Sequence, residues 1–166
     1  MTIIVEDGSI VPDANSYLTI AEANTLLDDT FGIVPIVALT EKDLKLATQY
    51  LESFASEYQG FQVSPAAQSL QFPRNFVYIN CVPVPSDSIP TTLKTAQALA
   101  AYEQSIGHNL QPTNSGQAIT QKSIAGQISV SYADNGLGGQ LIFKQINQYL
   151  KALFNKQNSQ LNVFRI

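Results

Sequence analysis

The stretch that decides the fold spans residues 68–107 and reads Q-S-L-Q-F-P-R-N-F-V-Y-I-N-C-V-P-V-P-S-D-S-I-P-T-T-L-K-T-A-Q-A-L-A-A-Y-E-Q-S-I-G. It opens with an aromatic–proline–arginine triplet, Phe72-Pro73-Arg74, and a loop punctuated by prolines follows. A guanidinium suits bidentate pairing with a carboxylate or capping of backbone carbonyls. We therefore interpret the triplet as a structural anchor and Arg74 as an internal contact, with a ligand contact as the alternative.

The second half of this stretch predicts a helix over residues 90–106. Pro90 suits the first helical turn, because its missing N–H would have no partner there and its φ is already helical. The proline disfavours the α conformation for Ile89, which should therefore be the last non-helical residue. Gly107 supplies a left-handed stop. Apolar residues recur at helical spacing and predict one narrow stripe for close packing: Leu93, Ala96, Leu99 and Ala100.

Two helices are predicted before this stretch and one after it. Thr19 and Glu22 form a capping-box pattern, which predicts a helix of about three turns ending near Asp28-Asp29. Thr40 should cap a second helix that stops at Gly60. Its apolar stripe consists of Leu44, Ala47, Leu51, Phe54, Ala55 and Tyr58, and that of the last helix of Ile142, Ile146, Tyr149, Leu150 and Leu153.

The remaining segments have the patterns of arms, loops and one hairpin. Residues 1–15 predict an extended arm or a short strand pair, and the apolar segment 31–39 predicts a packed connector. Alternation over 128–132 predicts a strand, paired with residues 119–124. The predicted fold is mainly α: a small helical domain of three to four helices, one β-hairpin and extended N- and C-terminal arms. We place the domain at 1–154 and a tail at 155–166.

Composition bounds the function. The chain has 166 residues, 45% hydrophobic and 13% charged, which fits one globular domain with a substantial core. A surface so poor in charge is expected to be partly covered by neighbouring subunits. The net charge is −4, and the scattered Lys and Arg offer no cationic face of the kind that tracks phosphates. An acidic balance suits a surface past which DNA slides.

Compartment signals are sparse. Cys81 is the single cysteine, so the chain has no internal disulfide and no cysteine-rich zinc site. The N-terminus lacks a basic region followed by an apolar run, and no apolar run approaches membrane-spanning length. We expect a protein made in the cytosol without a membrane partner.

Candidate chemistry is equally sparse. His108, the only histidine, follows a predicted helix end, where a cation is favourable, and this interpretation outweighs a catalytic base. The least explained acidic pair is Asp28-Asp29, but its context lacks the oxygen ligands of a calcium loop. The glycines at 136, 138 and 139 lack the Lys-Ser/Thr of a phosphate loop. We therefore expect no catalytic, cofactor or metal site, and no enzyme activity.

Three segments together resemble a known family: A-N-S-Y-L-T-I-A-E-A at 14–23, L-Q-F-P-R-N at 70–75 with I-P-T-T-L-K-T-A at 89–96, and I-S-V-S-Y-A-D at 128–134. Their order and spacing are similar to tailed-phage proteins of a DnaT-like single-stranded-DNA-binding family. The genes of that family resemble those of head–tail connector adaptors, also called head-completion proteins. The resemblance covers residue 1 to about residue 154. The family triplet usually begins with Trp, where this chain has Phe72.

The resemblance implies a structural virion protein in the phage neck, assembled in the host cytoplasm. Its subunits would form a closed ring, a dodecamer, between the portal and a tail or neck protein, and double-stranded DNA would pass without specific binding. The apolar tail end suits a segment that orders on the portal, through Leu161, Val163, Phe164, Arg165 and Ile166. The alternatives are a single-stranded-DNA-binding protein, another neck or tail-completion protein, and a small hydrolase using His108.

Overall fold

The structure is a computed structural model of the chain and describes residues 2–111, 121–124, 128–131 and 143–155. Four helices are present in those ranges: α1 (Ile20–Phe31), α2 (Glu41–Glu52), α3 (Thr91–Ser105) and α4 (Lys144–Lys151). Six short strands pair in antiparallel twos: β1 (Phe61–Gln62) with β2 (Arg74–Asn75), β3 (Tyr78–Ile79) with β4 (Val82–Pro83), and β5 (Gln121–Ile124) with β6 (Ile128–Ser131). The prediction of a small helical domain with a β-hairpin is confirmed, and the pairs β1–β2 and β3–β4 are additions to it.

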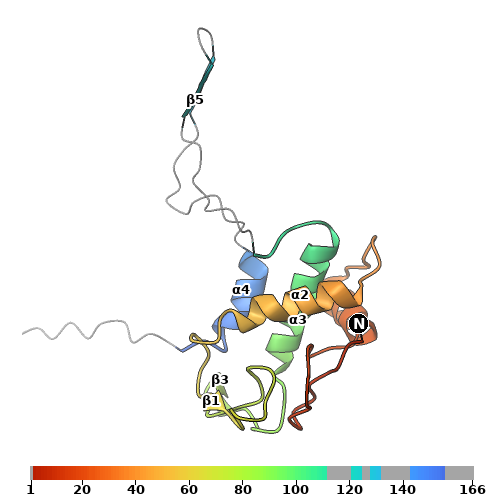
Figure 1. The fold of residues 1–166 in the computed structure, drawn as a ribbon, viewed down its shortest axis with the longest axis vertical. Coiled ribbons are helices and arrows are strands. Elements are labelled where there is room, and N and C mark those ends of the chain that lie inside the picture. Colours follow the sequence, from red (N-terminus) through yellow and green to blue (C-terminus); the bar gives the residue numbers. More distant parts are fainter. Residues whose placement is uncertain (1, 112–120, 125–127, 132–142, 156–166) are drawn as a thin grey trace, which may run out of the picture.

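Helix α3 is the centre of the domain and packs against α1, α2 and α4 (Figure 1). The predicted narrow stripe is wrong, because almost the whole middle of the helix is buried. The reason is side-chain size: alanine on several faces lets three helices approach at once. The helix begins at Thr91 and not at the predicted Pro90, which is the N-cap with φ −57° and ψ 135°. The buried positions are Leu93, Thr95, Ala96, Gln97, Ala98, Leu99, Ala100 and Ala101.

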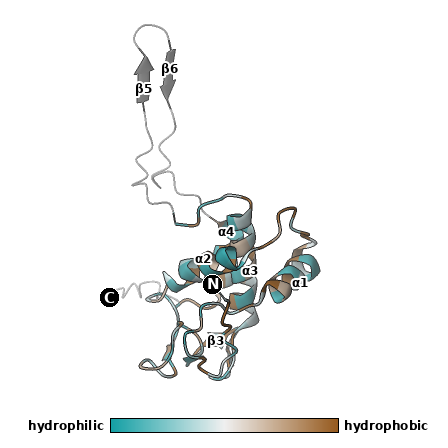
Figure 2. Cartoon of the chain, turned by 45° about the vertical axis from the view of Figure 1, so that its right-hand side comes forward, coloured by the Kyte–Doolittle hydropathy of each residue, from teal (hydrophilic) through white to brown (hydrophobic). Residues whose placement is uncertain are grey.

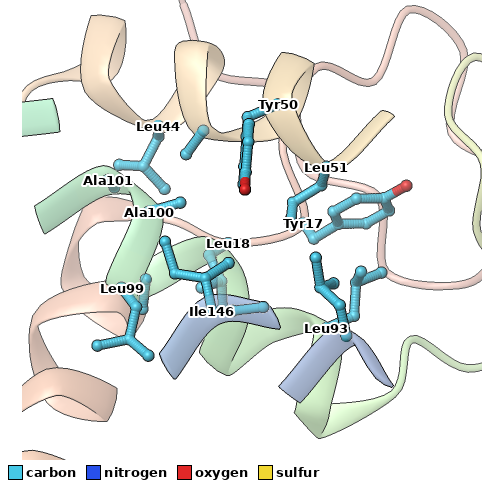
Figure 3. Packing of buried hydrophobic residues seen from close by; sticks show 14 of the residues in the cluster. Tyr17, Leu18, Leu44, Tyr50, Leu51, Leu93, Leu99, Ala100, Ala101 and Ile146 are labelled. Carbon is cyan, nitrogen blue, oxygen red and sulfur yellow. The ribbon is translucent and has the colours of Figure 1, made fainter. Parts of the chain in front are cut away.

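The core lies where α2, α3 and α4 meet (Figure 3). Leu44 and Leu51 of α2 and Ile146 of α4 are fully or almost fully buried there. The side chains of this layer come from all three helices and from the segment before α1. Because α3 contacts the other three helices, it fixes the positions of the loops that connect them.

Both early helices begin as the sequence predicts. The Thr19 hydroxyl accepts the Glu22 N–H at 3.2 Å, and the Glu22 carboxylate accepts the Thr19 N–H at 2.8 Å. Thr40 forms the same reciprocal pair at the start of α2. The ends differ from the predictions: α1 continues to Phe31, and α2 stops at Glu52 instead of Gly60. Turns follow α2, where Phe54 and Ala55 of the predicted stripe are half-buried. Tyr58 is buried, and its hydroxyl donates to the Leu51 carbonyl at 2.9 Å.

The N-terminal segment folds back on the domain. Val5 forms a parallel bridge with Ser16, and the fully buried Glu6 carboxylate organises the loop between them. It accepts the N–H groups of Gly8, Ile10 and Val11 at 2.9–3.0 Å. A carboxylate that accepts several backbone N–H groups replaces the water it loses on burial. The sequence does not reveal this role of Glu6, because the partners of its carboxylate are all backbone groups.

Candidate functional site

The aromatic–proline–arginine triplet lies in the interior. The Phe72 ring is 1% exposed and meets the Tyr58 ring edge-on, with centroids 5.1 Å apart. The Phe72–Pro73 peptide bond is cis. A buried aromatic pair of this geometry contributes about 0.5–1.5 kcal/mol beyond its buried area. Phe72 therefore serves as the predicted anchor.

Arg74 caps backbone carbonyls, as the sequence analysis expects of an internal contact. Its guanidinium donates to the carbonyls of Gln59 and Gly60 and to the Gln71 side chain, each at 2.8 Å. Arg74 is 7% exposed. Its guanidinium carbon lies over the rings of Tyr58 and Phe72, 5.9 and 6.0 Å from their centroids. These donors point at internal acceptors, so Arg74 holds the loop after α2 as an internal contact.

A second internal network joins α2 to the same loop. The Tyr17 hydroxyl donates to the Glu52 carboxylate at 2.6 Å and accepts the Phe72 N–H at 3.2 Å. Glu52 also accepts the Gln71 N–H at 2.8 Å. Burial raises the pKa of Glu52, and burial together with the nearby Glu52 charge raises the pKa of Tyr17. Every member of this network has a protein partner, so we interpret it as structural.

Gln97 of α3 forms a buried polar contact with α2 and with the segment before α1. Its amide nitrogen donates to the hydroxyls of Ser16 (2.7 Å) and Thr48 (2.9 Å), and its oxygen accepts the Tyr17 N–H at 3.0 Å. The side chain is fully buried. The periodicity of the sequence marks apolar positions only, so it cannot reveal a glutamine that ties α2 and the segment before α1 to α3.

The residues considered for chemistry lie in separate, exposed places. His108 follows the Gly107 turn, where its Nδ1 lies 2.6 Å from a Glu103 carboxylate oxygen. Cys81 is exposed in the turn between β3 and β4. Asp28 and Asp29 are exposed in the last turn of α1. Across the described ranges no group of three His, Cys, Asp or Glu residues is placed to hold a metal ion.

The segment after α1 is the largest departure from the predictions. We predict a packed connector, but Val34, Ile36 and Val37 are 74%, 95% and 51% exposed. The segment is held at its two ends, where Ile33 packs against the core and Leu39 is buried. We call residues 33–38 the connector loop; Figure 2 shows it as an apolar projection beyond α1. Apolar composition alone predicts burial, and it cannot distinguish burial in the same chain from burial against another molecule.

A second apolar surface lies on the short strands. Phe61, Phe76, Tyr78 and Val82 are 55%, 66%, 48% and 64% exposed, and we call these four residues the aromatic corner. The rings of Phe61 and Phe76 lie 5.3 Å apart. Phe76 has φ +61°, a left-handed conformation that costs a non-glycine residue about 1–2 kcal/mol. The fold thus holds an aromatic ring in water at a conformational cost.

Gly60 makes this arrangement possible. Its φ is +65°, and a Cβ there would lie 1.8 Å from the carbonyl oxygen of Asn75. Only glycine permits so close an approach of two backbones. The approach holds Phe61 and Phe76 side by side at the corner.

A pocket of about 420 Å³ opens beside the aromatic corner. Tyr78 belongs to the aromatic corner and also lines the pocket, as does Cys81. The other wall comes from the residues that follow α4. The segment between α2 and β1 holds them in place, since the Gln59 N–H donates to the Leu153 carbonyl at 2.9 Å. The pocket is lined by Gln59, Tyr78, Asn80, Cys81, Ala152 and Asn155.

The two apolar surfaces lie on opposite sides of the helical body and carry no charge of their own. The connector loop lies beyond α1, whereas the short strands lie at the other end of the domain (Figures 1 and 2). Residues 30–40 contain no charged side chain, and residues 59–84 contain only Arg74, which is buried. Such patches mark interaction sites in soluble proteins.

Comparison with known proteins gives one match. The family described as "Putative DnaT-like ssDNA binding protein" matches residues 1–166. The chain belongs to this family. No curated protein and no solved structure matches it. The family match extends over the last dozen residues as well, which the sequence resemblance leaves out.

Several predicted features of this family member lie outside the described residues. These are the tail end predicted to bind a partner (Leu161, Val163, Phe164, Arg165 and Ile166) and the glycines at 136, 138 and 139. Within the described part of the chain, no helix has the length and apolar character needed to cross a membrane. The exposed apolar surfaces that the sequence does not reveal are the connector loop and the aromatic corner, for which the low charge of the segments is the available signal.

Proposed function

We propose that the chain is an adaptor subunit of a tailed-phage head–tail connector. In this role it is a structural protein of the virion neck that forms a ring between the portal and the tail and lets DNA pass. The observation that carries the proposal is the pair of exposed, uncharged apolar surfaces on opposite sides of one small domain. The sequence resemblance to phage adaptors supplies the biological setting.

Two different surfaces on opposite sides are what a ring requires. Each subunit of a cyclic ring with more than two members contacts one neighbour through one patch and the other neighbour through a different patch. A single patch would suffice for a two-fold dimer. The low charged fraction of 13% agrees with a subunit whose sides are covered by neighbours.

The electrostatics agree with DNA passing through without being held. Proteins that grip DNA neutralise phosphates with clustered Lys and Arg. This chain has 9 Lys and Arg against 13 Asp and Glu, and the described cations do not form a cluster near either apolar surface. An acidic lumen would repel phosphates and keep the passage free.

The ring proposal is tested by the mass of the purified protein in solution. Light scattering behind a sizing column would be measured for the protein alone and mixed with the portal protein from the same genome. We expect a ring-sized species, alone or with portal. A monomer that ignores the portal at all concentrations would contradict the proposal.

The tail end is proposed as the portal-binding segment. Removal of residues 161–166 should leave a folded domain, because the last buried core residue of the described chain is Leu153. The truncated protein should no longer comigrate with portal. Normal portal binding by the truncated protein would refute this part, and a loss of helical circular dichroism would show instead that the tail belongs to the fold.

Binding of single-stranded DNA is the second candidate, and one observation favours it besides the family description. The rings of Phe61, Phe76 and Tyr78 are exposed, and exposed aromatics can stack with bases. Such sites combine stacking with a cationic groove, however, and the strand segment offers only the buried Arg74. Fluorescence anisotropy with labelled oligothymidine at low and high salt tests it: we expect no salt-dependent binding, and tight binding at low salt would favour this candidate.

A further inference from the structure

We propose that the tail end of a free subunit, residues 161–166, docks in a hollow of its own domain between the last turn of α1 and the connector loop. The occupant of the hollow is therefore the same chain and not a partner. The part that this contact plays in assembly rests on the proposed ring, whereas the docking itself does not.

The hollow has a volume of about 470 Å³ and two kinds of lining. Asp28 and Asp29 supply two carboxylates from α1. The connector loop, which projects beyond α1 in Figure 2, supplies an apolar wall that includes Ile33, Val34 and Pro35. The hollow thus suits an apolar segment that carries a positive charge.

The two carboxylates of the hollow lack a cation. No described residue forms an ion pair with Asp28 or Asp29, and the last turn of α1 contains no basic residue. Carbonyl groups at a helix C-terminus carry a partial negative charge, so anions are unfavourable there and a cation is stabilising. A positively charged segment would therefore offset the repulsion at this end of α1.

The tail has the matching chemistry. Outside the described residues the chain has only two basic side chains, Lys156 and Arg165, and both belong to the tail. Arg165 stands within the apolar sequence L-N-V-F-R-I. A guanidinium can pair with a carboxylate through two parallel hydrogen bonds. The neighbouring Val163 and Phe164 would cover the apolar wall while Arg165 meets the carboxylates.

The tail is long enough to return to its own α1. Asn155, the last described residue before the tail, follows Tyr149 of α4 by six positions, which span at most about 20 Å. The Tyr149 ring meets the ring of Phe31, the last residue of α1, with centroids 5.9 Å apart. From Asn155 to Arg165 the chain reaches up to about 33 Å when extended.

A tethered segment needs less contact area than a separate partner. Stable interfaces between two proteins bury about 800 Å² on each side, which six residues do not supply. Docking within one chain is different, because a short linker gives an effective concentration in the millimolar range. A weak contact of a few apolar side chains and one ion pair is then enough to keep the hollow occupied.

Docking would couple the two contacts of the proposed adaptor. The connector loop forms the apolar wall of the hollow, so a docked tail covers part of a proposed ring surface. Portal binding would withdraw the tail and free the connector loop for the next subunit. Without portal, the full chain should therefore be a monomer and the chain lacking residues 161–166 should form larger species. Two equal masses would refute this coupling.

The docking is tested by cross-linking in the full chain. The variant Ala38→Cys/Val163→Cys, with Cys81→Ser, places one thiol at the hollow and one in the tail end. A short bis-maleimide should join them in a product with the mass of a monomer, and mass spectrometry should find the linked peptides. The matched control replaces Ala38→Cys by Ala67→Cys, another exposed alanine, and should give several-fold less product. Equal yields, or links between two chains only, would overturn the proposal.

Charge reversal tests the ion pair in the same assay. Arg165→Glu should lower the yield several-fold, because it adds a third anion at the hollow. Adding Asp28→Lys/Asp29→Lys should restore the yield. Glu57→Lys/Asp87→Lys, an equal change of charge at two exposed acids outside the hollow, should not. A yield that ignores Arg165→Glu, or a rescue by both pairs alike, would refute the assignment of Arg165 to these carboxylates.

The failures of the two proposals are distinguishable. A ring-sized mass with portal, but no link between hollow and tail in the free subunit, would leave the ring standing and refute the docking. A link in a subunit that stays monomeric with portal would leave the docking standing and refute the ring. A monomer without the link would refute both.

Discussion

Two phenylalanines four positions apart have opposite environments. Phe72 is 1% exposed, in contact with Tyr58 and beneath the Arg74 guanidinium. Phe76 is 66% exposed and held in a left-handed backbone conformation. The environment of Phe72 is explained by partners within the chain. Phe76 contacts Phe61 but stays largely in water. The interior residue therefore stabilises the fold, whereas the exposed residue is available for the contact that the proposed ring requires.

The largest predicted effect follows from this pair. Phe72→Ala should lower the free energy of unfolding by about 3–5 kcal/mol, because it removes a buried ring and leaves a cavity. Phe76→Ala should lower it by less than about 1 kcal/mol, because the ring is largely in water. Urea unfolding of both variants, followed by circular dichroism, gives the two values. Equal losses would mean that Phe76 also belongs to the core and would break the comparison.

The buried glutamine comes next. Gln97→Leu should cost about 2–4 kcal/mol, since it leaves the Tyr17 N–H without its partner and takes a donor from the hydroxyls of Ser16 and Thr48. Gln104→Leu, on the same helix but only partly buried, is the matched control and should change stability by less than about 0.5 kcal/mol. The two urea midpoints should therefore differ clearly. A neutral Gln97→Leu would show that the apolar packing of α3 suffices without this network.

Arg74→Lys tests whether geometry or charge holds the triplet. Lysine keeps the positive charge but lacks the planar fork that reaches two carbonyls and a side chain together. We expect a loss of about 2 kcal/mol in the free energy of unfolding. Stability unchanged from the wild type would assign the role of Arg74 to its charge alone.

Glu52 gives a smaller, pH-dependent effect. Its pKa is raised by burial in the folded state, so the folded state binds the Glu52 proton more readily than the unfolded state does. Its contribution to stability is therefore full below the ordinary carboxyl pKa and is lost as the pH rises through the folded pKa. The unfolding free energy of the wild type should fall relative to that of Glu52→Gln from pH 4 to pH 7, by about 1 kcal/mol or less. Urea titrations at several pH values measure it, and a wild type that gains stability relative to the variant over this range would contradict the sign.

The sequence predicts the interior better than the exterior. Reciprocal caps at Thr19 and Thr40 are local, so their residues appear at fixed spacing and both helix starts are confirmed. The role of Arg74 follows from its flanking aromatic and proline. The end of α2 and the strands β1 to β4 escape prediction, because two-residue strands depend on contacts between segments distant in the chain. Hydrophobicity fails for the connector loop, where apolar residues point to water.

The most direct test of the central claim compares assembly with stability in one variant. Ile36→Asp places a charge at a side chain that is 95% exposed, so it should leave the urea midpoint of the isolated subunit unchanged. Its mass by light scattering, alone and with portal, should be that of a monomer where the wild type forms a ring-sized species, whereas Ile106→Asp should assemble normally. A ring-sized Ile36→Asp species would contradict the claim that the exposed apolar surfaces hold the subunits together.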